Sequence, residues 1–255
     1  NAMINAELKH AVMRDMVLLS LIGVKVVLVH GGGPEISQML KRVGKESVFV
    51  DGLRVTDEET AEIVQMVLAG KINKGLVAQL DNLGGRAMGI CGMDGGLIQA
   101  EMLDERLGYV GLIKEVHLQP LFDLLEKGYI PVVSSIGCDA SGHVYNINAD
   151  TAAAAVAASL HAESLISMTD IPGILLDPSD PSTLIRKVDL VQAQRLVDDG
   201  IITGGMIPKV ACCMDAIKAG VKKVFVIDGR IPHAILVETL TDEGIGTMFV
   251  KEDVS

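Results

Sequence analysis

The stretch VVLVHGGGPE at residues 26–35 joins an aliphatic run to the start of a helix, and it decides how the chain can fold. Residues 26–29 have the composition of a buried strand, and Pro34 is typical of a first helical turn. The three glycines between them leave a bare backbone, so several N–H groups can approach one anion. The helix N-terminus adds partial positive charge. The stretch therefore predicts a phosphate-binding turn, although a tight turn without a ligand would use the same residues.

This glycine turn matches neither of the two common phosphate-binding motifs. The chain contains no G-x-x-x-x-G-K-[ST] spacing. A dinucleotide fingerprint requires G-x-G-x-x-G, and the third glycine is replaced by Ile36. A dinucleotide-dependent dehydrogenase is disfavoured for this reason, and no hydride-transfer site is apparent either.

Composition narrows the class of protein further. Hydrophobic residues make up 49% of the 255 residues but aromatic residues only 3%, so the core must be aliphatic, as in parallel sheets covered by helices. The net charge of -11 disfavours nucleic acid and anionic membranes as partners. The four cysteines form no C-x-x-C pair, which indicates reduced thiols and no metal site. No signal peptide or long apolar run is visible, so a cytoplasmic location is expected.

Strands and helices alternate along the chain, which predicts an α/β fold with right-handed βαβ units. We expect one domain, residues 1–255, with two lobes of about 1–164 and 165–255. Thr56 is the expected N-cap of the third helix. Helices are predicted at 5–20, 34–42, 57–83 with a bend at Gly70, 119–127, 149–160, 191–198 and 208–219. Strands are predicted at 25–29, 87–91, 129–134, 164–168, 184–188 and 223–227, with hairpins within 94–117.

Two polar clusters lie at predicted helix starts, where open α/β sheets bind ligands. Arg54 precedes the helix at 57 and could grip a carboxylate with its planar guanidinium, or lie solvated at the surface. Asn146, Asn148 and Asp150 lead into an alanine-rich helix, where they could orient a ligand or only cap the helix.

The stretch TGGMIPK at residues 203–209 again places glycines before a helix with an early proline. Lys209 falls in the first turn of this helix, where a cation opposes the helix dipole by up to about 1 kcal/mol. A residue that works against local electrostatics indicates a function, so we expect Lys209 to contact phosphate. His30, by contrast, is expected to be a structural histidine.

Eight stretches resemble the amino-acid kinase family, and within it the arginine-sensitive N-acetylglutamate kinases. They occur in order over nearly the whole chain: VHGGGPEISQML, GLRVTDEE, MVLAGKINK, GYIPVVSSIG, YNINADTAAAAVA, TDIPGIL, DDGIITGGMIPKV and HAILVETLTDEGIGTM. The resemblance implies a three-layer αβα sandwich around a mainly parallel open sheet. It also implies transfer of the γ-phosphoryl of Mg-ATP to the side-chain carboxylate of N-acetyl-L-glutamate, in arginine biosynthesis.

The resemblance also implies roles for particular residues. The lobe before residue 164 would bind the acylated amino acid, with Arg54 on a carboxylate and with Asn146 and Asn148 on the substituents of its α-carbon. The glycines of the turn would donate N–H groups to substrate and transferring phosphoryl: Gly31, Gly32 and Gly33.

The lobe after residue 165 would bind the nucleotide. Lys209 would stabilise charge on the phosphoryl group and the leaving ADP, and Asp150 would hold the catalytic lysines in place. The remaining residues lining the nucleotide would be Asp170, Gly173, Thr203, Gly204, Gly205 and Met206.

The C-terminal stretch resembles the arginine-inhibited members, and it implies L-arginine contacts at Glu238 and Gly244. Those members form homo-oligomers, either dimers or hexamers when an additional N-terminal helix is present. The family also begins with a strand that ends in Lys-x-Gly-Gly, and the sequence given starts after it, at Asn1. The resemblance thus leaves open a kinase that requires that segment or a non-catalytic, ligand-binding or regulatory relative. On either alternative we expect the 255-residue chain to be a poor catalyst.

Overall fold

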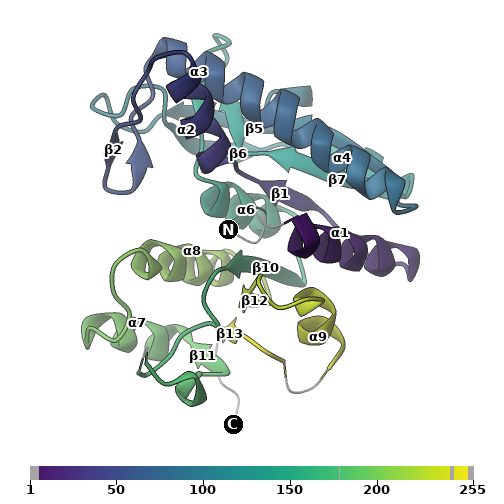
Figure 1. Cartoon of the computed structure of the whole chain (residues 1–255), viewed down its shortest axis with the longest axis vertical. Coiled ribbons are helices and arrows are strands. Elements are labelled where there is room, and N and C mark those ends of the chain that lie inside the picture. Colours follow the sequence, from purple (N-terminus) through teal and green to yellow (C-terminus); the bar gives the residue numbers. More distant parts are fainter. Residues whose placement is uncertain (1–5, 178, 242–243, 252–255) are drawn as a thin grey trace. The chain divides into compact units, whose positions relative to one another are not determined.

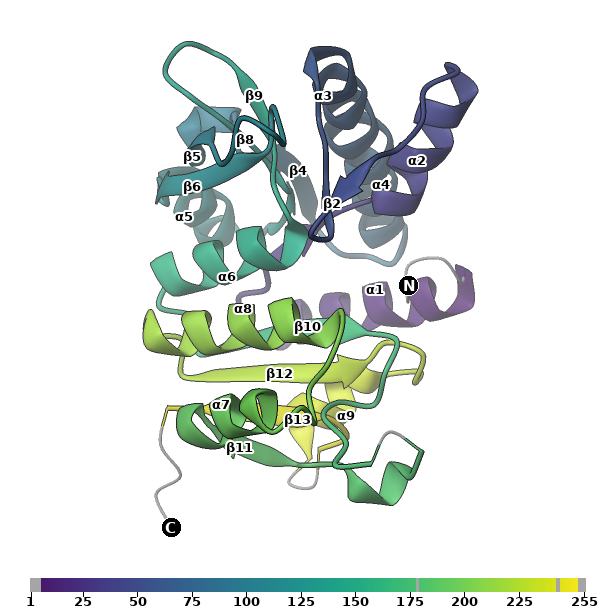
Figure 2. The same cartoon turned by 90° about the vertical axis from the view of Figure 1, so that its left-hand side faces the viewer.

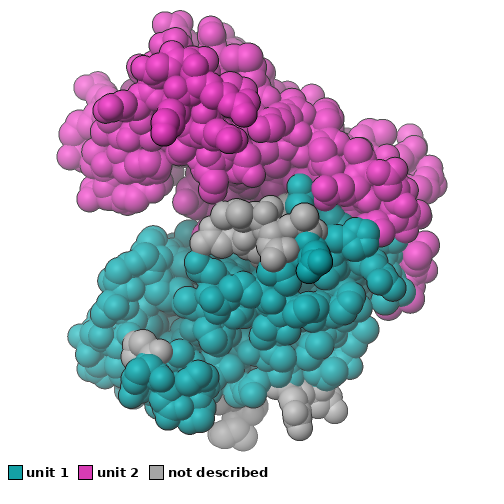
Figure 3. All heavy atoms as spheres, viewed as in Figure 1, with its two compact units in different colours: residues 1–19, 156–255 teal, residues 20–155 magenta. Residues whose placement is uncertain are grey.

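The computed structural model describes residues 6–177, 179–241 and 244–251. The chain forms two compact units, one of residues 1–19 and 156–255 and the other of residues 20–155 (Figure 3). Each unit is built from its own helices and strands, with one sheet in the unit 1–19 and 156–255 and several in the unit 20–155 (Figures 1 and 2). No helix among the described residues is long and apolar enough to cross a membrane.

The central sheet of the unit 20–155 has three parallel strands in the order β1-β7-β4. These strands are β1 (Leu28–His30), β7 (Ile130–Ser134) and β4 (Ala87–Cys91). Every residue of β7 is buried, as expected for the middle strand of a covered parallel sheet. The predicted strands are confirmed, but β1 is shorter than the aliphatic run at residues 25–29.

One long helical run packs over the glycine turn. It consists of α3 (Glu58–Gln65), a π-helical segment (Met66–Ile72) and α4 (Asn73–Asn82), and the predicted bend at Gly70 falls inside the π-helical segment. Ile36 and Leu40 of α2 (Gly33–Arg42) join Val64 and Leu68 of this run in one buried cluster. The other helices of the unit are α5 (Gln119–Glu126) and the first part of α6 (Ala149–Ser159).

The same unit carries a second sheet in the order β6-β5-β8-β9 and a small hairpin. The predicted rim hairpin is confirmed by the antiparallel pairing of β5 (Ile98–Met102) with β6 (Gly111–Val116), after a short 3₁₀ turn at Asp94–Gly96. The sequence analysis did not predict the remaining strands, which are β8 (Ile136–Cys138), β9 (Val144–Asn146), β2 (Phe49–Val50) and β3 (Leu53–Arg54).

The other unit has a four-stranded sheet in the order β10-β12-β13-β11, in which only the β12–β13 pair is antiparallel. Its strands are β10 (Ser164–Thr169), β11 (Lys187–Asp189), β12 (Lys223–Asp228) and β13 (Thr247–Val250). Its helical segments are α1 (Ala6–Leu21), a 3₁₀ turn (Pro181–Thr183), α7 (Leu190–Asp198), α8 (Met206–Lys218) and α9 (Ala234–Leu240). Figure 1 shows α8 and α9 on either side of β12.

The predicted N-cap of α3 is wrong by one residue. Asp57 caps the helix, because its carboxylate accepts the Thr60 amide at 2.9 Å. The Thr56 hydroxyl is buried and donates to the Arg54 carbonyl at 2.8 Å. The hydrogen bond from Lys45 Nζ, at 2.7 Å, together with that from Thr60 lowers the pKa of Asp57 to about 2. The cap is therefore ionised at neutral pH.

We predict that Asp57→Ala lowers the free energy of unfolding by about 1 kcal/mol, the usual contribution of an N-cap side chain. Asp57→Asn keeps a capping oxygen and should lose much less at pH 7. The pKa of Asp57 is depressed in the folded chain, so its ionic stabilisation is present above the unfolded pKa of about 3.9. That stabilisation is lost as the pH falls through about 2. Urea unfolding from pH 7 to pH 2 should show this decline in the wild type, and an equal decline in Asp57→Asn would contradict it.

Candidate active site

The glycine turn between β1 and α2 is held by close packing. A Cβ atom on Gly32 would collide with Ile72 Cδ1 and lie 2.9 Å from Leu68 Cδ2, both in the π-helical segment. A Cβ atom on Gly31 would lie 2.9 Å from the Cβ of Ala149. Gly33, in contrast, faces open space, with nothing within 4 Å of such an atom. A side chain on Gly31 would thus meet the Cβ of Ala149, and one on Gly32 would have to displace the ends of the Ile72 and Leu68 side chains. Gly33 lies on the open side of the turn.

The carbonyl groups of the turn are already engaged within the protein. The Gly32 carbonyl accepts the Ile36 amide at 2.9 Å, and the Gly33 carbonyl accepts Arg54 Nη2 at 3.0 Å. In a trans peptide the N–H points away from the carbonyl, so the Gly33 N–H points out of the start of α2. No hydrogen bond within the described part of the chain uses the Gly32 or Gly33 N–H. The turn thus offers backbone donors at a helix N-terminus, which suits an anion.

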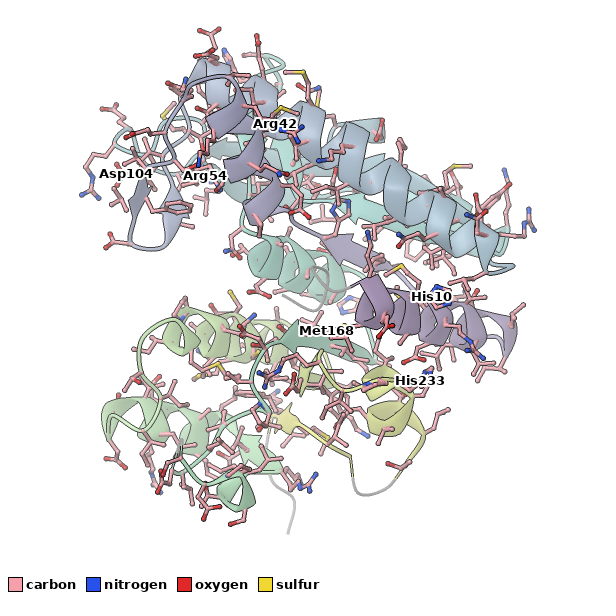
Figure 4. The ribbon with its side chains drawn as sticks, viewed as in Figure 1. His10, Arg42, Arg54, Asp104, Met168 and His233 are labelled. Carbon is pink, nitrogen blue, oxygen red and sulfur yellow. The ribbon has the colours of Figure 1, made fainter. Side chains whose placement is uncertain are left out.

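Arg54, labelled in Figure 4, lies beside this turn at the end of β3. Only 6% of the residue is exposed. Its guanidinium donates to Ser47 Oγ at 2.6 Å and to Ser37 Oγ at 2.9 Å, and it lies over the Phe49 ring at 4.7 Å. Burial lowers its pKa from the ordinary value. None of its partners among the described residues is a carboxylate. A buried cation that has only neutral partners favours an anionic ligand.

The structure gives the hydrogen-bond partners of the two asparagines before α6, for which the sequence allowed either ligand binding or helix capping. Asn146 Nδ2 donates to Thr56 Oγ1 at 3.3 Å, so it belongs to the framework around Arg54. Asn148 Oδ1 accepts the amides of Asp150 and Thr151 at 2.9 and 3.1 Å, which is the capping role. Asp150 lies in the first turn of α6. The ligand contacts predicted for Asn146 and Asn148, and the role of Asp150 in holding the catalytic lysines, stay predictions.

In the other unit, the residues predicted to bind nucleotide lie around β10 and α8. Lys209, in the first turn of α8, donates from Nζ to Ser167 Oγ of β10 at 3.3 Å. The turn before α8 is closed by the Met206 amide, which donates to the Thr203 carbonyl at 3.2 Å, and it includes Gly204 and Gly205. Asp170 directly follows β10. This arrangement brings Lys209 to the strand that precedes Asp170.

Among these nucleotide-binding candidates, position 173 is one that only glycine can occupy. Its φ is 142°, and a Cβ atom there would lie 2.6 Å from Thr247 Oγ1. The close approach lets the Ile174 amide donate to Thr247 Oγ1 at 2.9 Å. The structure thus explains Gly173 by packing, and its contact with nucleotide stays a prediction.

An ion pair that was not predicted from the sequence lies at the same end of this sheet. Thr169 and Asp228 are register partners at the carboxyl ends of β10 and β12. Arg230 contacts Asp228 through Nε at 2.9 Å and through Nη2 at 2.7 Å. Burial raises the pKa of Asp228, but the hydrogen bonds from Arg230 outweigh burial and leave it below the ordinary value. The DGR tripeptide after an aliphatic strand was the available signal.

The two residues predicted to contact arginine lie next to each other. Glu238 is 8% exposed, and its Oε2 accepts the Ile245 and Gly246 amides at 2.7 and 2.9 Å. A Cβ atom on Gly244 would lie 2.8 Å from Glu238 Oε1. The Gly244 carbonyl accepts Arg186 Nη1 at 2.8 Å. The carboxylate therefore shapes the backbone at 244–246, and its contact with a ligand stays a prediction.

The predicted residues separate cleanly between the units. Those predicted for the acylated amino acid, and Asp150, lie in residues 20–155, whereas those predicted for the nucleotide lie in residues 156–255. Within the described ranges no group of three or more His, Cys, Asp or Glu side chains could hold a metal ion.

A glycine turn at a helix start with a buried arginine beside it suits the binding of an anionic ligand, and comparison with known proteins gives the family. Residues 2–228 match the model of the amino acid kinase family, so the chain belongs to that family. The α/β fold class predicted from the sequence is thereby confirmed.

Its relatives include proteins named acetylglutamate kinase. That of Brachyspira hyodysenteriae is 55% identical over 99% of this chain and 88% of its own length. That of Caldanaerobacter subterraneus subsp. tengcongensis is 52% identical over 99% of this chain and 85% of its own length. Among solved structures, smu.665 from Streptococcus mutans is 29% identical with a TM-score of 0.81, and the match covers 94% of this chain and 91% of that one. The predicted resemblance to acetylglutamate kinases is confirmed.

We predict that alanine at two adjacent glycines of the turn affects different properties: stability for Gly32 and ATP binding for Gly33. Gly32→Ala should lower the melting temperature strongly, because its methyl group would displace Leu68 and Ile72. Gly33→Ala should fold normally, since its methyl group meets open space, yet weaken ATP binding by crowding the donors of the turn. Thermal unfolding and calorimetry with ATP would separate the two effects. Equal melting temperatures for both variants would contradict the packing explanation.

Proposed function

We propose that this protein transfers the γ-phosphoryl group of ATP to the side-chain carboxylate of N-acetyl-L-glutamate. The observation that carries the proposal is Arg54, a buried guanidinium with neutral partners among the described residues. It lies beside a glycine turn in which the Gly32 and Gly33 N–H groups donate no hydrogen bond within the described part of the chain. A cation next to anion-binding amides suits a substrate that carries carboxylates and receives a phosphoryl group. The identity of 52–55% to acetylglutamate kinases supports this substrate.

In the proposed reaction the unit 20–155 binds the acceptor. Arg54 holds a carboxylate of N-acetyl-L-glutamate through its fork of N–H donors, and Asn146 and Asn148 contact the groups on the α-carbon. Gly31 donates its N–H group to N-acetyl-L-glutamate. The N–H groups of Gly32 and Gly33 stabilise the negative charge on the transferring phosphoryl group.

The other unit binds ATP in this proposal. Lys209 neutralises charge on the phosphoryl group and on the leaving ADP. Asp150, which belongs to the unit 20–155, holds the catalytic lysines of the family in place. The segment at Asp170 and Gly173 and the turn 203–206 line the nucleotide. Magnesium arrives with ATP as part of the substrate complex, because Mg²⁺ is commonly held by phosphates and few protein ligands.

The chemistry asks little of the protein beyond position and charge. The side-chain carboxylate of the acceptor is ionised at neutral pH, since its ordinary pKa is about 4.3, and needs no general base. Phosphoryl transfer depends on in-line positioning and on neutralising the three equatorial oxygens. Backbone amides, an arginine and a lysine supply these requirements.

Three further proposals rest on the same likeness. The protein acts in arginine biosynthesis in the cytoplasm, and it assembles as a homo-oligomer. L-Arginine binds at Glu238 and Gly244 as an inhibitor, because a buried carboxylate close to a backbone turn suits a guanidinium.

The reaction is tested by trapping its product. With ATP, magnesium and N-acetyl-L-glutamate, hydroxylamine should capture an acyl phosphate in proportion to the ADP released. L-Glutamate and N-acetyl-L-aspartate are matched acceptors, one lacking the acetyl group and the other shorter by one methylene. Binding of N-acetyl-L-glutamate without any trapped product would favour a ligand-binding relative, and equal use of all three acceptors would refute the proposed substrate.

We predict that Arg54→Ala weakens binding of N-acetyl-L-glutamate by about 2–5 kcal/mol, the cost of truncating one partner of a buried charge pair. ATP affinity should change little. Arg42→Ala is the matched control, because it removes the same charge from an exposed position on α2. Calorimetry with each ligand measures both effects, and unchanged acceptor affinity in Arg54→Ala would remove Arg54 from the site.

A further inference from the structure

One buried polar network near the glycine turn has no part in the proposed reaction so far. Asn73, the first residue of α4, is fully buried, and His30, the last residue of β1, is 6% exposed. Asn73 Nδ2 lies 3.1 Å from His30 Nε2, and His30 Nδ1 lies 3.0 Å from the Gly31 carbonyl oxygen. The network therefore runs from α4 through β1 into the turn.

The orientation of the Asn73 amide is fixed by its neighbours. Lys74 Nζ can only donate and lies 3.1 Å from Asn73 Oδ1, so that oxygen is the acceptor. The amide nitrogen then faces the Val132 carbonyl at 2.8 Å and the Ile90 carbonyl at 3.3 Å. One side chain thus contacts all three strands of the β1-β7-β4 sheet. Gly89 makes room for it, because a Cβ atom there would collide with Asn73 Oδ1.

The tautomer of His30 follows from the orientation of Asn73. The Asn73 amide nitrogen has two hydrogens for three neighbours and cannot accept a hydrogen bond. A hydrogen bond between it and His30 therefore requires that His30 Nε2 accepts and carries no proton. The ring proton is then on Nδ1, which donates to the Gly31 carbonyl. This bond fixes the plane of the peptide between Gly31 and Gly32.

A fixed peptide plane also fixes its N–H group. The chain contains no cis peptide bond, so the Gly32 N–H points away from the Gly31 carbonyl and from His30. We propose that Asn73 and His30 are positioning residues that aim the Gly32 N–H at the transferring phosphoryl group. This inference rests on the proposed function, and it gives a role to Asn73 in the stretch MVLAGKINK.

The hydrogen-bonded pair of Asn73 and His30 is called the relay below. The π-helical segment places this relay against the turn. Its wide turn carries one residue more than an α-helical turn, and such segments recur at functional sites. Ile72, its last residue, packs against Gly32, and Asn73 directly after it reaches the sheet. The same helix therefore sets both the position of the turn and the direction of its donor.

The test compares replacements that keep different halves of the imidazole. His30→Asn places an amide nitrogen near the position of Nδ1 and should retain most of kcat. His30→Gln keeps a polar group near Nε2 only, and kcat should fall about 10²-fold, the cost of a donor displaced by about 1 Å. Asn73→Ala should lower kcat about 10- to 100-fold. Removing a residue that orients a functional group by a hydrogen bond typically has an effect of this size. KM for N-acetyl-L-glutamate should change little in each variant.

Leu80→Ala is the control for stability, because Leu80 is fully buried in α4 and lies outside the relay. It should lower the melting temperature and leave kcat unchanged below that temperature. A kcat in His30→Gln equal to that of Leu80→Ala would overturn the relay.

A spectroscopic measurement keeps the inference separate from the proposed function. The imidazole ¹⁵N spectrum of the wild type should show His30 protonated at Nδ1 and bare at Nε2, and Asn73→Ala should admit the other tautomer. A proton on Nε2 in the wild type, as tautomer or as imidazolium, would overturn the relay whatever the enzyme assay shows. If the wild type forms no acyl phosphate, the proposed function fails and this spectrum still decides whether the relay exists.

Discussion

The close approach of the glycine turn to the π-helical segment is the constraint on which the unit 20–155 depends. Gly32 touches Leu68 and Ile72 so tightly that no side chain fits between them. That contact fixes where β1 ends, where α2 begins and how far Asn73 reaches into the sheet. Since protein interiors are packed at crystal-like density, a shift of this contact would move all three together. The geometry of the turn is thus a property of the core as well as of three glycines.

Local positive charge is the second theme of the structure. The chain carries a net charge of -11, so an anionic ligand must be attracted against the overall field. Arg54 provides a buried guanidinium whose positive charge is little screened by water. The N-terminus of α2 adds a partial positive charge. In the other unit Lys209 occupies a first helical turn and is held to β10 through Ser167. Arg54 thus lies at the end of β3, and Lys209 lies at the start of α8.

Motifs with short sequence spacing were predictable, and those completed by distant residues were not. The glycine turn, the start of α2 and the position of Lys209 followed from adjacent residues. The cap of α3 was misplaced by one residue because Thr56 and Asp57 are both good caps, and only the hydrogen bond to Thr60 distinguishes them. Strands β8 and β9 were missed because each contains a single aliphatic residue, whereas the equally short β1 lies within an aliphatic run.

By itself the sequence determined the α/β class, the order of most elements and the family. These properties depend on periodicity, glycine, proline and residue type, which are local. Only the tertiary structure decided that Arg54 is buried against Ser37 and Ser47, that Asn148 caps α6, and that Asn73 bonds to His30. Asn73 and His30 are 43 residues apart, and nothing in their own neighbourhoods specifies that contact. It arises because the sheet and the helix over it must close around one core, which brings their polar groups together and obliges them to pair.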